Sequence, residues 1–322
     1  MHWGVEVAED TFGKGFLYEE EYATIFPAVE AAANLCESIA DNKANTASSK
    51  ADDTPVTSIF LARLRNLQSQ TWLRTEEDLV NVTEDQKSRL ETVLNQSITV
   101  QKLPLPSLET KRFWTIDPID GTKGYLRGGQ YAICVALVVD QEVQLAFIAC
   151  PRLPTSLSDS LATLFVAIRS LGVLEMSFSD GGHRRLGFGL RSSSQTQPIL
   201  AESYESNHTD HQFSETFSRA LNLSKETIRM DSQCKYGIVA RGDAHIYLRR
   251  PTKPGYTERI WDHAPGVLIV EEAGGTVTDF EGKRIVFAPE AALSRAGGIL
   301  ATNLPTGHST VLTVLQAIKH SN

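Results

Sequence analysis

The sequence predicts an α/β fold of layered helices and sheets, with an α+β arrangement as the alternative. Two apolar segments rich in β-branched residues, 131–140 and 143–150, are separated by turn residues around Asp140, which indicates neighbouring strands. Helical patterns lie on both sides of these segments, and no internal repeat or low-complexity linker interrupts the chain. This mixture of strand pairs and helices favours layers packed around a shared core.

Four segments are predicted to be helical. Residues 18–40 place apolar side chains at helical spacing despite Pro27, and 84–97 carry acids in the first turn, where the helix dipole favours them. A third helix begins at Trp261 and runs through the following glutamates, and a fourth covers 307–319. Together these segments supply the helical layers of the predicted fold.

Shorter apolar runs predict further strands at 113–116, 164–169 and 244–249. The polar, turn-rich stretch 41–55 and the proline-containing stretch 98–111 are predicted to be loops. The strands are therefore concentrated in the middle of the chain, between helical segments.

Length and charge limit the classes of protein that this chain can represent. Its 322 residues indicate one large domain or two closely packed halves. The formal net charge of −8, with no lysine- or arginine-rich block, lacks the basic face that duplex nucleic acid or an anionic membrane requires. A small phosphorylated ligand remains compatible with this charge. We therefore expect a small-molecule substrate, no nucleic acid, no membrane and no obligate protein partner.

The sequence also predicts a reducing compartment. No apolar run approaches the ~20 residues needed to span a bilayer, and the N-terminus lacks an apolar signal core. We therefore expect a cytoplasmic protein. Four scattered cysteines without a C-x-x-C pair are predicted to be buried free thiols: Cys36, Cys134, Cys150 and Cys234.

One candidate motif reads Asp-Pro-Ile-Asp-Gly-Thr-Lys-Gly at 117–124. Asp117 and Asp120 directly follow a predicted strand, and carboxylate and carbonyl oxygens are hard ligands suited to Mg²⁺. After the turn at Gly121, the backbone N–H groups of Gly121 and Thr122 can bind a phosphate oxygen. The alternative is an ordinary Asp-Gly turn, which occurs often by chance.

A second candidate motif reads Trp-Asp-His-Ala-Pro-Gly at 261–266, followed by Glu-Glu-Ala-Gly-Gly at 271–275. Asp262 falls in the first turn of the predicted helix. Taken alone, it is better explained as a helix cap or as an acid that interacts with the helix dipole than as a metal ligand.

Together the two motifs make the chain resemble the inositol monophosphatase superfamily, whose paired signature they match. The similarity to the bisphosphate nucleotidase branch of that superfamily extends over most of the chain from Tyr18 onward. It is carried by four further stretches, at 123–137, 202–212, 231–249 and 258–266.

The resemblance implies a layered αβαβα fold and hydrolysis of phosphomonoesters with two or three Mg²⁺ ions. The implied metal ligands are Glu76, Asp117, the carbonyl of Ile119, Asp120 and Asp262. Glu77 is the alternative to Glu76, because Thr75 replaces the glycine expected before the acid. Clustered carboxylates repel one another until a divalent cation neutralises them. Thr122 and Asp120 are implied to be catalytic, and Thr122 to orient the attacking water.

The implied substrate is adenosine 3′,5′-bisphosphate, with 3′-phosphoadenosine 5′-phosphosulfate as its sulfated relative. An N-terminal metal-binding α+β half at 1–155 and a C-terminal α/β nucleotide-binding half at 156–322 are expected. The implied substrate-binding residues are Gly121, Thr122, His208, Ser232, Lys235, Arg249 and Asp262. Within this set Lys235 and Arg249 are the candidates for contact with the second phosphate. Both are positively charged, and arginine binds phosphate through its planar guanidinium.

Lys235 and Arg249 can each also be explained without a role in substrate binding. Arg249 also fits a solvated cation at a strand end, and Lys235 an exposed surface charge. His208 and His211 have the H-x-x-H spacing of zinc ligands, but no further ligand cluster lies nearby in the sequence, which favours a surface loop.

The segment 58–74 departs from the family pattern. An acid is expected a few residues after the Val-Thr pair that ends at Thr57, but Phe60 stands there, and the segment is short by about two helical turns, roughly seven residues. An erroneous sequence and a degenerate enzyme both fit. Three hypotheses therefore stay open: a bisphosphate nucleotidase with impaired activity, an inositol phosphate phosphatase, and a catalytically weak protein that binds metal or nucleotide.

Overall fold

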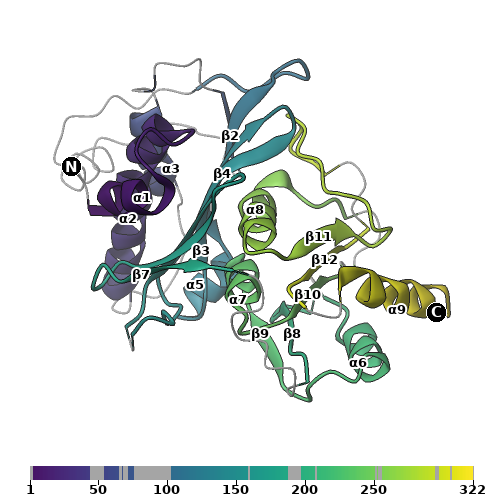
Figure 1. Ribbon diagram of the computed structural model, residues 1–322. Helices are drawn as coiled ribbons and strands as arrows, with labels where there is room; N and C mark the ends of the chain where they lie inside the picture. The colour runs from purple at the N-terminus through teal and green to yellow at the C-terminus, as the bar shows by residue number, and fades with distance from the viewer. Residues whose placement is uncertain are drawn as a thin grey trace.

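The structure is a computed structural model that describes residues 3–43, 54–64, 67, 72–75, 103–158, 160–187, 197–206, 209–250, 252, 256–293, 297–304 and 307–321. These residues form two sheets with helices outside and between them (Figure 1). The strand order is β1-β2-β3-β4-β5-β6-β7 in the large sheet and β11-β12-β10-β8-β9 in the small one.

The large sheet is antiparallel except for the parallel pair β1–β2. Its strands are β1 Leu73–Thr75, β2 Arg112–Asp120, β3 Ala132–Val139, β4 Glu142–Cys150, β5 Thr163–Ile168, β6 Gly172–Ser177 and β7 His183–Leu186. The strands predicted at 113–116, 131–140, 143–150 and 164–169 are confirmed as β2, β3, β4 and β5. All residues of β3 except the last are buried, because helices cover both faces of the sheet. This burial explains the continuous apolar run.

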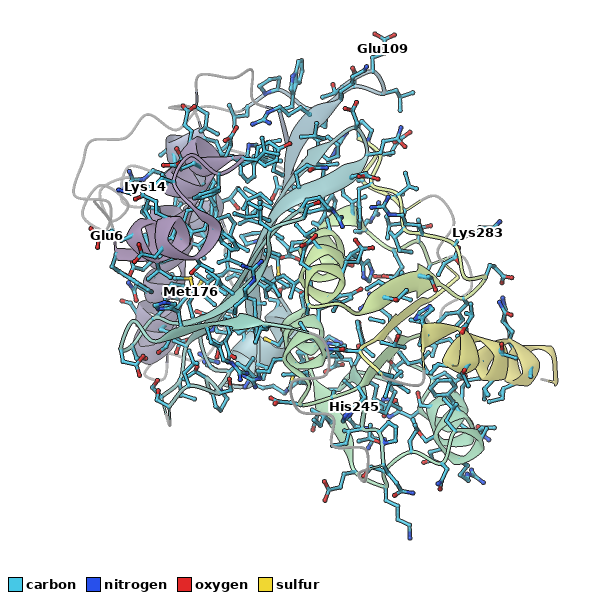
Figure 2. The ribbon with its side chains drawn as sticks, in the orientation of Figure 1. Glu6, Lys14, Glu109, Met176, His245 and Lys283 are labelled. Atoms are coloured by element: carbon cyan, nitrogen blue, oxygen red, sulfur yellow. The ribbon has the colours of Figure 1, made fainter. Side chains whose placement is uncertain are left out.

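Three helices cover the outer face of the large sheet: α1 Trp3–Phe12, α2 Glu19–Lys43 and α3 Thr54–Leu64 (Figure 1). The helix predicted at 18–40 is confirmed as α2, which continues through Pro27. The loop predicted at 41–55 was too long, since α2 extends into its start and α3 begins before its end. Met176 of β6, labelled in Figure 2, belongs to the apolar core between these helices and the sheet.

Two helices lie between the sheets, α7 Cys234–Arg241 and α8 Ala264–Glu272 (Figure 1). The short 3₁₀ helix η1, Ile260–Asp262, leads into α8 and confirms the helix start predicted at Trp261. One apolar core joins these helices to the inner faces of both sheets. On its α8 side β3 carries small residues such as Ala132 and Ala136, which leave room for the helix.

The small sheet completes the layers. Its strands are β8 Leu200–Ser203, β9 Thr227–Met230, β10 Ile246–Arg249, β11 Thr276–Asp279 and β12 Ile299–Thr302. Helices α6 His211–Ala220 and α9 His308–Ser321 cover its outer face over a third apolar core (Figure 1). His245, labelled in Figure 2, precedes β10. The predictions at 244–249 and 307–319 are confirmed, and so is the αβαβα order of layers.

The boundaries of some elements differ from those predicted. The large sheet continues to Leu186 and the small one begins at Leu200, so the sheets change later than residue 155; the division into halves stays a prediction. The short helix α5, Thr122–Leu126, follows β2 and was not predicted. The predicted helix 84–97 lies outside the described residues. All four cysteines are buried and free, as predicted. Within the described ranges, none of the helices combines the length and apolar character of a membrane span.

Candidate active site

The first aspartate motif lies at the end of β2. In a regular strand, residues three apart point to opposite faces of the sheet. The pairing of β2 with β3 shifts register between Asp117 and Asp120, however. Because of this irregularity, carboxylate oxygens of both residues can meet Asp262, with the three ligand atoms within 4.8 Å of one another.

The turn after β2 depends on glycine. Gly121 has φ of 82°, a left-handed conformation that favours glycine, and it precedes α5. A Cβ atom at this position would lie 3.0 Å from the Cβ of Ser232. The turn therefore packs directly against the segment between β9 and α7. The Thr122 hydroxyl donates a hydrogen bond to the carbonyl of Ile119 at 3.1 Å, which ties the turn together.

The second motif brings Asp262 to the site from η1. Behind it, Arg249 Nε donates to the carboxylate of Glu258 at 2.8 Å. The buried His263 lies 2.9 Å from the same carboxylate through Nε2 and 2.8 Å from the hydroxyl of Tyr236 through Nδ1. This chain of contacts fixes the backbone on both sides of Asp262.

The pKa values of Asp120 and of Glu258 are shifted in opposite directions. Burial raises the pKa of the Asp120 carboxyl, an effect opposed by the charge of Lys235 and by the backbone N–H of Gln233. Burial also acts on Glu258, but the charges of Arg249 and His263 bring its pKa down to about 2. The charge of Glu258 is thus balanced by Arg249 within the protein, whereas the three aspartates form an acidic cluster in which Asp117 is buried and the other two are half-buried.

The aspartates form part of the wall of a cavity of about 280 Å³. Its lining also contains Ser232, Lys235 and Arg249, together with Ile119, Gly121 and Thr122, so nine of the eleven predicted site residues line one cavity. Glu76 and His208 lie outside the described residues.

The alternative predictions for Lys235, an exposed surface charge, and for Arg249, a solvated cation at a strand end, are wrong. Lys235 is only 2% exposed and Arg249 8%, so neither is a solvated surface charge. The Lys235 ammonium donates to the carbonyls of Met230 at 3.0 Å and of Ser232 at 2.6 Å. Burial lowers the pKa of Lys235 to about 8. Both cations are thus held at the wall of the cavity, where an anion can reach them.

Other residues at the site were not singled out from the sequence. Glu205 and Asp231 also line the cavity, and both accept hydrogen bonds from Arg127. Glu205 accepts another from Lys123 at 2.9 Å. Gln233 contacts both aspartate motifs. All five lie in stretches that carry the family resemblance, but their residue types alone give no signal of these contacts.

The position expected to carry an acid lies in the core. Phe60 of α3 is fully buried in the apolar cluster between α2 and the large sheet. The sequence of α3, Thr54–Leu64, contains no Asp or Glu. This helix therefore brings no carboxylate to the site.

Comparison with known proteins gives the family. A sequence model described as the Inositol monophosphatase family matches residues 18–320. A 3′(2′),5′-bisphosphate nucleotidase of Emericella nidulans is 31% identical, with 94% of this chain and 99% of the relative covered. One of Oryza sativa is 34% identical, with 95% and 96% covered.

Solved structures share the fold. The extragenic suppressor protein SuhB of Bartonella henselae matches with a TM-score of 0.64 at 20% identity, covering 94% of this chain and all of that one. An inositol monophosphatase of Zymomonas mobilis matches with a TM-score of 0.63 at 17% identity, covering 94% and 99%. The chain belongs to the inositol monophosphatase family and, within it, to the group of the 3′(2′),5′-bisphosphate nucleotidases.

Proposed function

We propose that this chain is a Mg²⁺-dependent phosphatase that hydrolyses the 3′-phosphate of adenosine 3′,5′-bisphosphate to give AMP and phosphate. 3′-Phosphoadenosine 5′-phosphosulfate is its proposed second substrate. The observation that carries the proposal is one cavity with three converging aspartates and two buried cations on its wall. The near full-length similarity to bisphosphate nucleotidases supports the choice of substrate.

The donor set fits a divalent cation. Asp117, Asp120 and Asp262 present hard oxygen atoms within 4.8 Å of one another, and their mutual repulsion is relieved when a cation binds. We assign two or three Mg²⁺ ions to these residues, with the carbonyl of Ile119 and the carboxylate of Glu76 as further ligands. When bound, Mg²⁺ supplies a more acidic water and offsets charge on the phosphoryl group.

The residues of the turn after β2 hold the reacting phosphate and the water. The hydroxyl of Thr122 is fixed by its hydrogen bond to the Ile119 carbonyl and follows Asp120 by two residues, so it is the group assigned to orient the attacking water. The backbone at Gly121 and Thr122 is assigned to the phosphate oxygens. Phosphoryl transfer depends mainly on positioning and charge stabilisation, which such fixed groups provide.

Lys235 and Arg249, which line the same cavity, are assigned to the second phosphate. The Lys235 ammonium has three N–H bonds, and backbone carbonyls accept two of them, so one more can be donated to a phosphate oxygen. Arg249 presents its planar guanidinium at the same wall. Ser232 and His208 are assigned to the nucleotide. A substrate with a single phosphate would not use both the aspartate cluster and the two cations.

We expect slow turnover. Phe60 cannot accept a proton, and α3 offers no acid in its place. The alignment to the Emericella relative runs over 352 positions, more than the 322 residues of this chain, so the relative has residues that this chain lacks. The proposed enzyme thus retains the residues that bind the metal ions and the phosphates, but it lacks the acid of α3 that would activate the attacking water.

The proposal is tested by phosphate release at saturating Mg²⁺ from adenosine 3′,5′-bisphosphate and from inositol 1-phosphate. We expect measurable release with a clear preference for the nucleotide, in kcat/KM. Equal values, or a preference for the inositol compound, would assign the chain to inositol phosphates instead. No binding of either compound would refute the assignment of the cavity to phosphate esters.

A further inference from the structure

The segment that joins β9 to α7 contacts both aspartate motifs. Ser232 packs against Gly121 and has φ of 66°, a left-handed conformation that is uncommon for a residue other than glycine. Directly after it, the backbone N–H of Gln233 donates a hydrogen bond to the carboxylate of Asp120. The left-handed conformation of Ser232 thus directs the backbone N–H of Gln233 toward Asp120. Strained backbone of this kind is concentrated at functional sites.

The side chain of Gln233 holds the other motif. Its Nε2 donates to the carbonyl of Trp261 at 2.8 Å, and its Oε1 accepts from the backbone N–H of Gly266 at 3.0 Å. These two partners flank Asp262 in the chain, one on η1 and the other on α8. Gln233 is 2% exposed, so both hydrogen bonds are shielded from water. One residue is therefore bonded to the end of β2 and to the backbone around Asp262.

We propose that Gln233 is a positioning residue that sets the separation of the two aspartate motifs and thereby the affinity of the site for Mg²⁺. The inference rests on the proposed function. Gln233 acts through Asp120 and Asp262. Mg²⁺ demands near-ideal octahedral geometry, so a small displacement of one motif from the other weakens binding. Residues that orient metal ligands typically contribute about 10–100-fold to affinity.

The test compares two variants of the full chain by calorimetric titration with Mg²⁺. Gln233→Met keeps the length of the side chain but removes its two hydrogen bonds. The control, Asn303→Leu, removes two buried hydrogen bonds from the other end of α7, where Asn303 Nδ2 donates to the carbonyls of Val239 at 3.1 Å and Ala240 at 3.3 Å. Both changes lower the melting temperature, but only Gln233→Met should raise the Kd for Mg²⁺, by at least about tenfold.

A merely structural role for Gln233 predicts a different result. Equal Kd values for wild type and Gln233→Met, or equal losses of affinity in both variants, would overturn the inference. Absence of Mg²⁺ binding by the folded wild type would instead overturn the proposed function, and the inference with it. If Gln233→Met does not fold, Gln233→Leu gives the same comparison, because it also removes both side-chain hydrogen bonds and adds no charge beside the aspartates.

Discussion

Helix α3 and the end of β2 both belong to the N-terminal part of the chain, but they differ in what their residues do. Phe60 and its neighbours on α3 are buried in the apolar core. Asp117 and Asp120 of β2 are instead brought to a shared cavity with Asp262. A core accepts any apolar side chain of suitable size, whereas a metal site needs oxygen atoms at defined positions. The loss of an acid from α3 is therefore compatible with an intact fold and an intact binding cavity.

The largest expected effect on stability comes from α3. Replacing Phe60 by alanine removes a large buried side chain and should lower the free energy of unfolding by about 3–5 kcal/mol. Mg²⁺ affinity of the folded fraction should stay unchanged, because α3 brings no carboxylate to the site. Chemical denaturation and calorimetry measure the two quantities. A stable variant with weakened Mg²⁺ binding would show that α3 serves the site after all.

Replacing an aspartate at the end of β2 is expected to affect Mg²⁺ binding instead. Asp120→Asn should weaken Mg²⁺ binding and reduce kcat/KM by more than about 100-fold, since a direct ligand should matter at least as much as the outer-shell partners that contribute up to that amount. Asp140→Asn makes the same change in the left-handed turn between β3 and β4, which asparagine tolerates, and serves as control. Similar Mg²⁺ affinities in the two variants would refute the assignment of the metal site.

A smaller effect is expected from Arg249, which also lines the cavity. Arg249→Ala should remove most of the preference for adenosine 3′,5′-bisphosphate over adenosine 3′-monophosphate, which lacks the second phosphate, because a hydrogen bond to a charged group contributes about 1.5–3 kcal/mol. Competition binding with both nucleotides measures this preference. The adjacent Arg250 pairs with Asp210 at 3.1 Å and does not line the cavity, so Arg250→Ala should leave the preference intact. A retained preference in Arg249→Ala would place the second phosphate elsewhere.

The smallest expected effect is a dependence on pH. Because burial lowers the pKa of Lys235 to about 8, the ammonium is charged below this pH and increasingly neutral above it. Phosphate monoesters, with a second pKa near 6, are already fully ionised in this range. Affinity for the bisphosphate should therefore fall between pH 8 and 9.5, by at most about tenfold per unit. Lys235→Met should bind more weakly and lose this dependence; an unchanged pH profile in the variant would exclude Lys235 as its source.

The sequence predicted the elements whose patterns reflect burial. The runs at 131–140 and 143–150 became β3 and β4 because sheet residues covered on both faces must be apolar. The convergence of Asp117, Asp120 and Asp262 also followed from the two motifs and the family resemblance. By contrast, α3 was missed because residues 56–61 are all buried, the polar Thr57 and Ser58 included, so the segment shows no amphipathic period.

Other features of the site depend on contacts between distant parts of the chain. Lysine is almost never fully buried unless it is paired, so nothing in the sequence alone indicated that Lys235 would be enclosed by backbone carbonyls. The register shift in β2 arises from pairing with β3. Gln233 joins residues 113 positions before it and 28 after it, and no local pattern predicts such contacts.

The central claim is that binding is retained while water activation is impaired. It is tested most directly by comparing the chain with a variant in which residues 58–74 are replaced by an acid-containing segment of the length usual in the family, roughly seven residues longer. We predict similar Kd values for adenosine 3′,5′-bisphosphate, and a kcat for the variant that is at least ~100-fold higher, the lower end of what a general base contributes. Equal kcat values for two folded, nucleotide-binding proteins would contradict the account.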